Sequence, residues 1–325
     1  MTHSTLSQPP IETIDEPRRA RMKQQASQLT LLSNSVLLLL KIIVGAITGS
    51  VAVFAEIVNS AADLIGALIV FISVKRSADP PDATHAYGHG KIENMSGIVT
   101  ATLIVTGGVV MIWQSIMRLI HPAALDKVDW AVGVMGLSAV INALVSSRLS
   151  VVGRQTESPA LLADASHLRT DVLTSVGVFV GLILVQVTHW HSWDSIAALV
   201  VSTLILKVGY DVARESVDML VDRVLPAEEV KLLEAVIRNH PEVREFHRLR
   251  TRKAGSQRHA DVHVLLDDDH TLVIAHGIAE EIEDEMRAAL PNLDAMVHPE
   301  PYAEEMRHQQ EIDHGFAVED SSSGK

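Results

Sequence analysis

Long apolar segments are the feature that most constrains how this chain can fold. A helix needs about 20 residues to cross a hydrocarbon layer of about 30 Å, because each residue advances it by about 1.5 Å. Segments of this kind fall at roughly 30–49, 51–75, 93–120, 128–149, 160–187 and 193–218. The sequence therefore predicts a membrane all-α bundle of six helices over the first two-thirds of the chain.

The pattern beyond residue 220 is that of a soluble domain. Apolar residues recur there first at helical spacing and then at period two around a glycine turn. The elements expected are helices at 227–241 and 272–290 and strands at 243–255, 258–267 and 294–298. This αββαβ order predicts a small α/β domain with an antiparallel sheet.

Four parts of the chain follow from these patterns. They are an N-terminal segment 1–29, a transmembrane domain 30–220, a C-terminal αββαβ domain 221–304, for which cytoplasmic location and metal binding are argued from the residues below, and a disordered tail 305–325. The first part is polar, and the long apolar segment after it is followed by no small-residue cleavage pattern, so we expect no cleaved signal peptide.

The distribution of charge narrows the partners and the orientation. The net charge of −13 belongs mostly to 223–325, which argues against nucleic acid. Basic residues gather at the connections on one side: Arg18, Arg19, Arg21, Lys23, Lys75, Arg76, Lys91, Arg148 and Arg154. The opposite connections carry Lys127 alone. Basic loops stay inside, so we expect a multi-pass protein of the inner (cytoplasmic) membrane with both termini in the cytoplasm.

Two of the apolar segments carry polar stripes at the same i, i+3, i+7 spacing. The stripes are Glu56, Asn59 and Asp63 in the second segment and Asp164, His167 and Asp171 in the fifth. On a helix this spacing places the side chains of each stripe on one face. A carboxylate costs several kcal/mol in hydrocarbon, so each stripe is expected to face a cavity, a partner or an ion.

Facing stripes would bring four ligands together: Asn59, Asp63, His167 and Asp171. The chain has no cysteine, so any metal ligands must be oxygen and imidazole nitrogen. This set suits a tetrahedral site for a divalent transition metal, and protons could replace a departing ion. The alternative is that the stripes make only hydrogen bonds between helices.

Other polar residues of the apolar segments are open to several interpretations. Asn34 and Lys41 have no matching partners in the sequence, which favours packing or snorkelling. Glu56 and Asp164 lie one turn from the expected ligands, where a place on the access path or a helix cap is as reasonable as direct binding.

Two further clusters of ligand-type residues lie outside the apolar segments. Asp82, His85 and His89 stand among prolines and glycines on a turn, where they could form a metal site or only a polar loop. The second cluster is His247, His263, His276, His298 and Glu300. Pairing of the strands at 243–255 and 258–267 would bring the first two histidines together, and with the carboxylate they could hold two metal ions. The alternative is that they are surface histidines.

Together these motifs resemble the cation diffusion facilitator family, of the bacterial iron/zinc-efflux type. The resemblance covers about 28–303. Its specific pieces are Asn59 with Asp63, His167 with Asp171, "HAYGHGK" (85–91), "LVDRVLP" (220–226) and "HRLRTRKAG" (247–255).

The resemblance implies a homodimer in which each protomer has a transport site between the second and fifth helices. It also implies that the site works by alternating access driven by proton antiport. It implies a second metal at Asp82, His85 and His89, and a bridging pair at the four domain histidines. It also implies that Lys91 and Asp222 form a charge pair tying the two domains together at the dimer interface.

Two positions depart from the family's usual pattern. Asn59 stands where zinc and iron members usually carry Asp, and an amide there resembles manganese transporters. Manganese transporters of bacteria, however, commonly also replace the histidine that is retained here as His167. Glu300 stands where Asp is usual, which keeps the carboxylate on a longer arm.

The function that these features predict is export of a divalent transition metal, Zn²⁺, Mn²⁺ or Fe²⁺, in exchange for protons. The expected partners are a second copy of the chain, the lipid bilayer, metal ions and protons, with no organic cofactor. An alternative is a membrane-anchored metal sensor, but a sensor has no need of paired stripes in the membrane. A carrier of organic anions would need basic residues at the midplane, which only Lys41 approaches. We expect no enzyme, because no nucleophile with a base and no phosphate-binding loop appears.

Overall fold

The computed structural model describes residues 15–48, 51–120, 129–188, 190 and 192–307. The chain divides into two compact units, Met1–Leu220 and Val221–Lys325. The helices of the first unit are α1 Glu16–Thr48, α2 Val51–Ser77, α3 Lys91–Ile120, α4 Asp129–Thr156, α5 Pro159–Thr188 and α6 Ser192–Leu220. All six are long and apolar enough to cross a membrane, which confirms the predicted bundle.

Helix α1 begins earlier than the apolar content of the sequence indicates. We expected a span from about residue 30, whereas the helix begins at Glu16. The added residues are rich in Arg, Ala, Met, Lys and Gln, which are good helix formers although they are not apolar. The helix is therefore about four turns longer than the apolar segment from which it was predicted.

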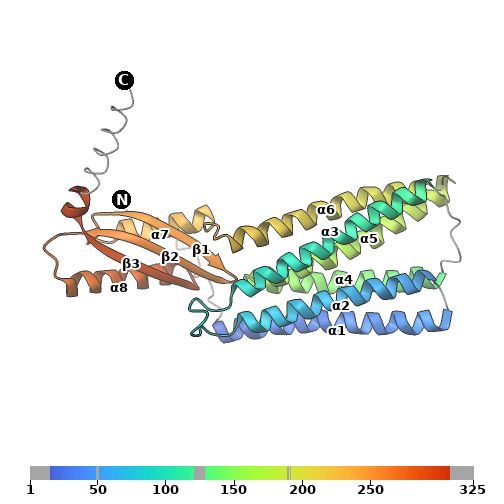
Figure 1. Ribbon diagram of the computed structural model, residues 1–325, viewed down its shortest axis with the longest axis horizontal. Helices are drawn as coiled ribbons and strands as arrows, with labels where there is room; N and C mark the ends of the chain where they lie inside the picture. The colour runs from blue at the N-terminus through green and yellow to red at the C-terminus, as the bar shows by residue number, and fades with distance from the viewer. Residues whose placement is uncertain (1–14, 49–50, 121–128, 189, 191, 308–325) are drawn as a thin grey trace, which may run out of the picture. The chain divides into compact units, whose positions relative to one another are not determined.

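The bundle is built from pairs of helices that pack along much of their length. α3 packs along α6, α1 along α2 and α4 along α5 (Figure 1). α3 and α6 approach closely where glycines face larger residues: a Cβ on Gly108 would lie 2.9 Å from Leu206, and one on Gly209 would lie 2.7 Å from Val105. Small residues at such crossings are typical of helices that associate in membranes.

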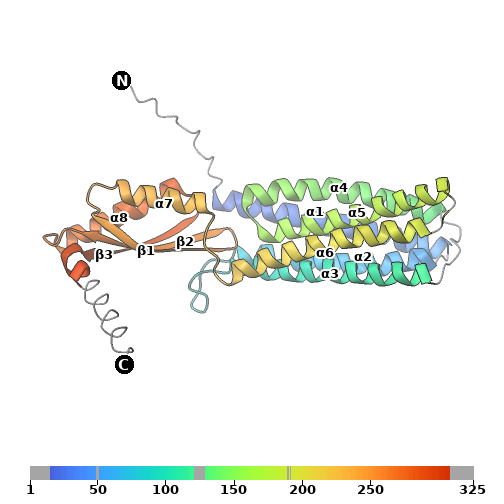
Figure 2. The ribbon, with the colours of Figure 1, turned by 90° about the horizontal axis from the view of Figure 1, so that it is seen from above.

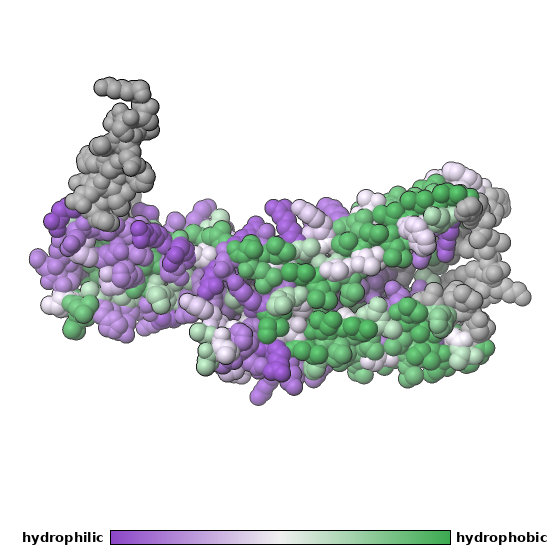
Figure 3. Space-filling view, viewed as in Figure 1, coloured by the Kyte–Doolittle hydropathy of each residue, from purple (hydrophilic) through white to green (hydrophobic). Residues whose placement is uncertain are grey.

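The outer surface of the bundle is apolar. On α1, Leu32, Leu39 and Ile47 are exposed by 63%, 59% and 80%. Figure 3 shows the same character over the visible face of the helical unit, where hydrophobic side chains predominate. A surface of this kind suits contact with lipid.

The buried carboxylate of Glu93 on α3 links several helices at one end of the bundle. Its side chain is 1% exposed, and its Oε1 lies 2.8 Å from Lys23 Nζ. The hydroxyl of Ser77 donates to the same oxygen at 2.8 Å, and the hydroxyl of Ser158 donates to Oε2. Ser158 also accepts the backbone N–H of Leu161, so it caps the start of α5. This Glu93 hub connects α1, α2 and α3 with the first turn of α5.

The second unit has the predicted αββαβ order. Its elements are α7 Ala227–Asn239, β1 Glu245–Ala254, β2 Gln257–Leu266, α8 Leu272–Ala289 and β3 Leu293–Pro301. Residues 302–307 add a short helical segment. Most of the predicted disordered tail, 308–325, lies outside the described residues.

The sheet is mixed, so the prediction of an antiparallel sheet was wrong. β1 pairs antiparallel with β2 through a tight turn at Gly255, whose φ is 61°. β2 and β3 are parallel. The helix between them carries the chain back along the sheet, so both strands start at the same end, as a crossover connection requires.

One face of the sheet holds the core of this unit. α7 contributes Leu233, α8 contributes Ile282 and Met286, and β2 contributes Val262 and Val264, each exposed by 1% or less. Figure 2 shows both helices on the same side of the strands. Successive residues of a strand point to opposite faces, so His263, between the two valines, points away from the core.

The Glu93 hub gives a prediction for stability. Glu93→Gln would remove the buried negative charge that pairs with the Lys23 ammonium, which costs about 3 kcal/mol. We expect a clear fall in the melting temperature of the detergent-solubilised protein by scanning calorimetry. Glu93→Gln combined with Lys23→Met should recover part of the loss.

The matched control is Glu215→Gln, which changes an exposed carboxylate on α6. An equal melting temperature for the wild type, the control and Glu93→Gln would show that the hub does not stabilise the bundle.

Candidate metal sites

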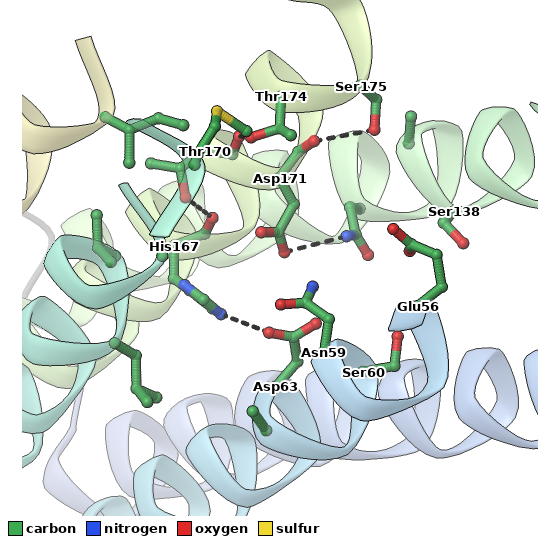
Figure 4. Close-up of a pocket in the computed structure, with 18 of the residues that line it drawn as sticks. Glu56, Asn59, Ser60, Asp63, Ser138, His167, Thr170, Asp171, Thr174 and Ser175 are labelled. Carbon is green, nitrogen blue, oxygen red and sulfur yellow. Dashed lines mark hydrogen bonds and ion pairs between the residues drawn. The ribbon is translucent and has the colours of Figure 1, made fainter. Parts of the chain in front are cut away.

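The two polar stripes of the bundle face one another. His167 Nε2 on α5 lies 3.1 Å from Asp63 Oδ1 on α2. Ligand atoms of Asp63, His167 and Asp171 lie within 4.8 Å of one another. Figure 4 shows Asn59 between Asp63 and Asp171. These residues are termed the helix site.

The helix site lies in a cavity of about 330 Å³ within the bundle. All four side chains of the helix site line it. The cavity is large enough for a cation with several waters. Its oxygen and imidazole donors are the ligand types that divalent transition metals accept.

One polar contact of the helix site was not predicted from the sequence. Asn142 on α4 directs its Nδ2 to Asp171 Oδ2 at 3.4 Å. This side chain is 8% exposed and holds the carboxylate from outside the stripes. The signal was available: an amide within an apolar span of this length normally faces the interior of the bundle.

The expectation that Asn34 and Lys41 lack partners was wrong. Lys41 Nζ lies 2.9 Å from Glu56 Oε2 and 2.7 Å from Ser60 Oγ. Asn34 donates to the backbone carbonyl of Asp63 at 3.4 Å. These partners lie on α2, and the spacing of residues on α1 alone gives no indication of them.

Glu56 and Asp164 are not helix caps, since both lie beyond the first turn of their helices. Glu56 lines the cavity. Asp164 is 3% exposed, and its Oδ2 has no hydrogen-bond partner among the described residues. It does not belong to the close group formed by Asp63, His167 and Asp171.

The loop between α2 and α3 brings its three expected residues together. Asp82 Oδ1 lies 3.4 Å from His85 Nδ1, and Asp82 Oδ2 lies 3.4 Å from His89 Nε2. The hydroxyl of Thr84 donates to Asp82 at 2.7 Å, a contact that the sequence analysis missed. Gly88, at φ 75°, provides the turn that returns His89 toward Asp82.

The electrostatics of this loop site favour an ionised carboxylate. The hydroxyl of Thr84 and the backbone N–H groups of His85 and Thr84 hold the pKa of Asp82 well below its usual range. A carboxylate that stays ionised is the form that binds a cation.

The sheet of the second unit brings together three of the five expected residues. Glu300 Oε2 lies 2.9 Å from His247 Nε2, and Glu300 Oε1 lies 2.7 Å from His263 Nδ1. The hairpin brings the two histidines near each other, as predicted, and a register shift between His247 and Arg250 makes them direct partners across β1 and β2. We call His247, His263 and Glu300 the sheet site.

The remaining two histidines lie differently. His298 Nε2 is 3.7 Å from Glu300 Oε1, and its ring centroid is 4.9 Å from that of His263, so it borders the sheet site. His276 on α8 is exposed and lies 3.4 Å from Glu280. His276 is not part of the close group, and its binding of metal stays a prediction.

The sheet site also favours an ionised carboxylate. Burial alone would raise the pKa of Glu300, but the hydrogen bond and charge of His263, with those of His247, outweigh it. The pKa of Glu300 is lowered as a result.

Lys91 and Asp222 each have contacts inside their own unit. Lys91 Nζ lies 3.4 Å from the backbone carbonyl of Leu220, and Asp222 Oδ1 lies 3.4 Å from a guanidinium nitrogen of Arg252. Their pairing with each other across the domains stays a prediction.

The sheet site gives a second prediction. We expect Glu300→Gln to weaken binding of Zn²⁺ there by about tenfold or more, because a charged ligand shared by two histidines becomes a neutral amide. The measurement is titration calorimetry on the full chain carrying Asp63→Asn and His89→Ala, which remove ligands of the other two sites.

Glu242→Gln is the matched control, because Glu242 also faces a histidine, His270, at 3.4 Å but lies outside the sheet site. Equal affinity in Glu300→Gln and this control would contradict the assignment.

Comparison with known proteins agrees with this architecture. The family model described as "Cation efflux transmembrane domain" matches residues 27–221, and "Cation efflux protein, cytoplasmic domain" matches residues 225–302. "Cation-efflux pump FieF" of Serratia proteamaculans (strain 568) is 31% identical over 294 residues, 88% of this chain and 95% of that protein. The protein of the same name from Salmonella choleraesuis (strain SC-B67) is 30% identical over 281 residues, 86% of this chain and 93% of that protein.

The chain also resembles solved structures of isolated cytoplasmic domains. One is the "Metal-bound C-terminal domain of CzcD transporter from Thermotoga maritima", 25% identical, which covers 24% of this chain and 94% of that chain with a TM-score of 0.22. The family models together span nearly the whole chain. The chain therefore belongs to the cation efflux family, also called the cation diffusion facilitators, and is a cation efflux transporter.

Proposed function

We propose that this transporter exports a divalent transition metal from the cytoplasm in exchange for protons. The observation that carries the proposal is the convergence of Asp63, His167 and Asp171 inside the bundle, with their ligand atoms within 4.8 Å. Asn59 completes the set as the fourth ligand. Carboxylates and an imidazole buried in a membrane protein are expensive unless a cation or protons neutralise them.

The same residues explain why protons would be the counter-ions. A histidine or carboxylate that binds metal must first lose its proton, so metal and proton compete for the helix site. If the site faces the cytoplasm when it takes up metal and the other side when it takes up protons, the competition becomes exchange.

The orientation follows from the basic residues. Lys75 and Arg76 end α2, Lys91 begins α3 and Arg154 ends α4, so these charges lie at one end of the bundle. The positive-inside rule assigns that end to the cytoplasm and, with it, both termini. The relatives are bacterial, which supports the inner membrane.

We further propose that the transporter is a homodimer and that the loop and sheet sites bind the same class of metal. Support comes from the match of residues 225–302 to the cytoplasmic domain of the family. His298 and Met296 on β3 are largely exposed on the face of the sheet away from its core, where a second copy could pack. The predicted Lys91–Asp222 pair would tie the two domains together at the dimer interface.

The candidate metals are Zn²⁺, Mn²⁺ and Fe²⁺. Asn59 offers a neutral oxygen, which favours manganese over zinc relative to a carboxylate, whereas His167 supplies the imidazole that suits zinc. A metal sensor without transport is less favoured, because sensing through the sheet site would leave the helix site and its cavity without a role.

The central prediction concerns the two aspartates. Asp63→Asn and Asp171→Asn should each abolish uptake of Zn²⁺ and Mn²⁺ into inside-out vesicles under an imposed proton gradient, because each removes a charged ligand. The matched control is Asp211→Asn on α6, an exposed carboxylate that pairs with Lys207. Uptake at the wild-type rate in either cavity variant, at equal protein content, would rule out the proposed helix site.

A further prediction concerns metal choice. Asn59→Asp adds a carboxylate to the helix site and should raise Zn²⁺ uptake relative to Mn²⁺ by about tenfold. The same vesicles, supplied with equal concentrations of both metals, give the ratio directly. An unchanged ratio would show that Asn59 does not select the metal.

A further inference from the structure

An ammonium group lies in the wall of the transport cavity. Lys41 is 5% exposed and belongs to an apolar stretch of α1. Its Nζ contacts Glu56 Oε2 at 2.9 Å and Ser60 Oγ at 2.7 Å, and all three residues line the cavity. A lysine that snorkels would extend its head group toward the membrane surface, whereas this one is held inside by partners on α2.

A fixed positive charge is an unexpected neighbour for a cation-binding site. A charged lysine has no lone pair to offer a metal, and it repels a divalent cation in the same cavity. Burying it also costs free energy, which the contacts with Glu56 and Ser60 must offset. Packing alone therefore does not explain why a lysine lies beside the helix site.

The charge of the cavity supplies one reason. The ionisable residues in its lining are Lys41, Glu56, Asp63, His167 and Asp171. Three carboxylates and one ammonium carry a formal charge of −2 when the histidine is neutral, so one divalent cation neutralises the lining. Without Lys41, the same lining would retain a negative charge after the cation had bound.

The location of the pair supplies a second reason. Glu56 precedes Asp63 by seven residues on α2, about 10 Å toward the connection between α1 and α2. Figure 4 shows Glu56 and Ser60 on the side of the cavity away from His167. On the other side of the helix site, Val70 and Val74 of α2 belong to a buried apolar cluster with residues of α1, α4 and α5.

A cation that leaves the helix site toward the α1–α2 connection therefore passes Glu56. With both termini in the cytoplasm, this is the direction of export. Glu56 is partly exposed, and Lys41 contacts one of its carboxylate oxygens and the hydroxyl of Ser60. These two oxygens can bind a passing ion only when the ammonium moves away.

We propose that Lys41 is a tethered counter-cation of the transport cavity. Its ammonium binds Glu56 Oε2 and Ser60 Oγ when the cavity is empty. It moves away from these two oxygens when the departing divalent cation binds them. It then recaptures them, so that the cation leaves. This inference rests on the proposed transport function and assigns Glu56 as a transient ligand on the release path.

The test compares Lys41→Met and Glu56→Gln by the concentration dependence of Zn²⁺ and Mn²⁺ uptake into inside-out vesicles. Removing the ammonium leaves three carboxylates, so KM should fall about tenfold and kcat should fall with it, because the cation is released slowly. Removing the Glu56 carboxylate leaves the Lys41 ammonium without its ion-pair partner and makes the cavity less negative, so KM should rise about tenfold. The double variant keeps the formal charge of −2 and should return KM close to the wild-type value.

Lys207→Met on α6 is the matched control, since it removes an exposed lysine of the same bundle and should leave KM unchanged. If the pair only stabilises the packing of α1 against α2, both single variants should lower the melting temperature without shifting KM in opposite directions. Shifts of KM in the same direction, or no shift, in the two single variants overturn the inference.

If Lys41→Met does not accumulate in the membrane, Glu56→Gln and the double variant still decide the question. An unchanged KM in Glu56→Gln overturns the inference by itself. Failure of the wild type to move Zn²⁺, Mn²⁺ or Fe²⁺ would instead reject the proposed function, so the two failures are distinguishable.

Discussion

The cost of placing charge in hydrocarbon governs the arrangement of this bundle. Each buried ionised side chain must find an opposite charge, a set of hydrogen bonds or an ion. Glu93 has Lys23 and two serine hydroxyls, and Lys41 has Glu56. Asp63 and Asp171 have only His167 and Asn142 in the described part of the chain, which is less than two carboxylates need. The buried carboxylate of the Glu93 hub thus has its full set of partners, whereas the two carboxylates of the helix site do not. The transported cation is proposed to bind at the helix site.

The second unit gathers its ligands by a different physical device. A hairpin with a register shift between His247 and Arg250 sets His247 opposite His263, and the parallel pairing of β2 with β3 sets His298 beside the same histidine. Glu300 follows two residues later on the same strand and reaches both His247 and His263 with its longer arm. The register of the strands, rather than the neutralisation of buried charge, fixes this cluster. It lies on the face that the helices leave open.

The sequence was sufficient wherever position along one element decided the outcome. The spacing of Asn59 and Asp63 and of His167 and Asp171 predicted which helix faces meet. The Gly255 turn predicted that His247 and His263 lie near each other, although not the register shift that makes them direct partners. It was insufficient wherever contacts between elements decided. Asn142, the partners of Lys41 and the Glu93 hub depend on which helices are neighbours, and the sequence of a single chain does not reveal that. The parallel β2–β3 pair was missed because strand patterns alone do not give direction, although the helix between the strands does.

The Glu93 hub also bears on how the bundle is assembled during synthesis. Lys23 is made 70 residues before Glu93, whereas Ser158 is made 65 residues after it. The first carboxylate oxygen can therefore be satisfied as soon as α3 enters the membrane beside α1 and α2. The second must wait for the start of α5, the helix that brings His167 and Asp171. A chain truncated before Ser158 presents a half-satisfied acid, and that distinguishes an unfinished bundle from a complete one before any metal is bound.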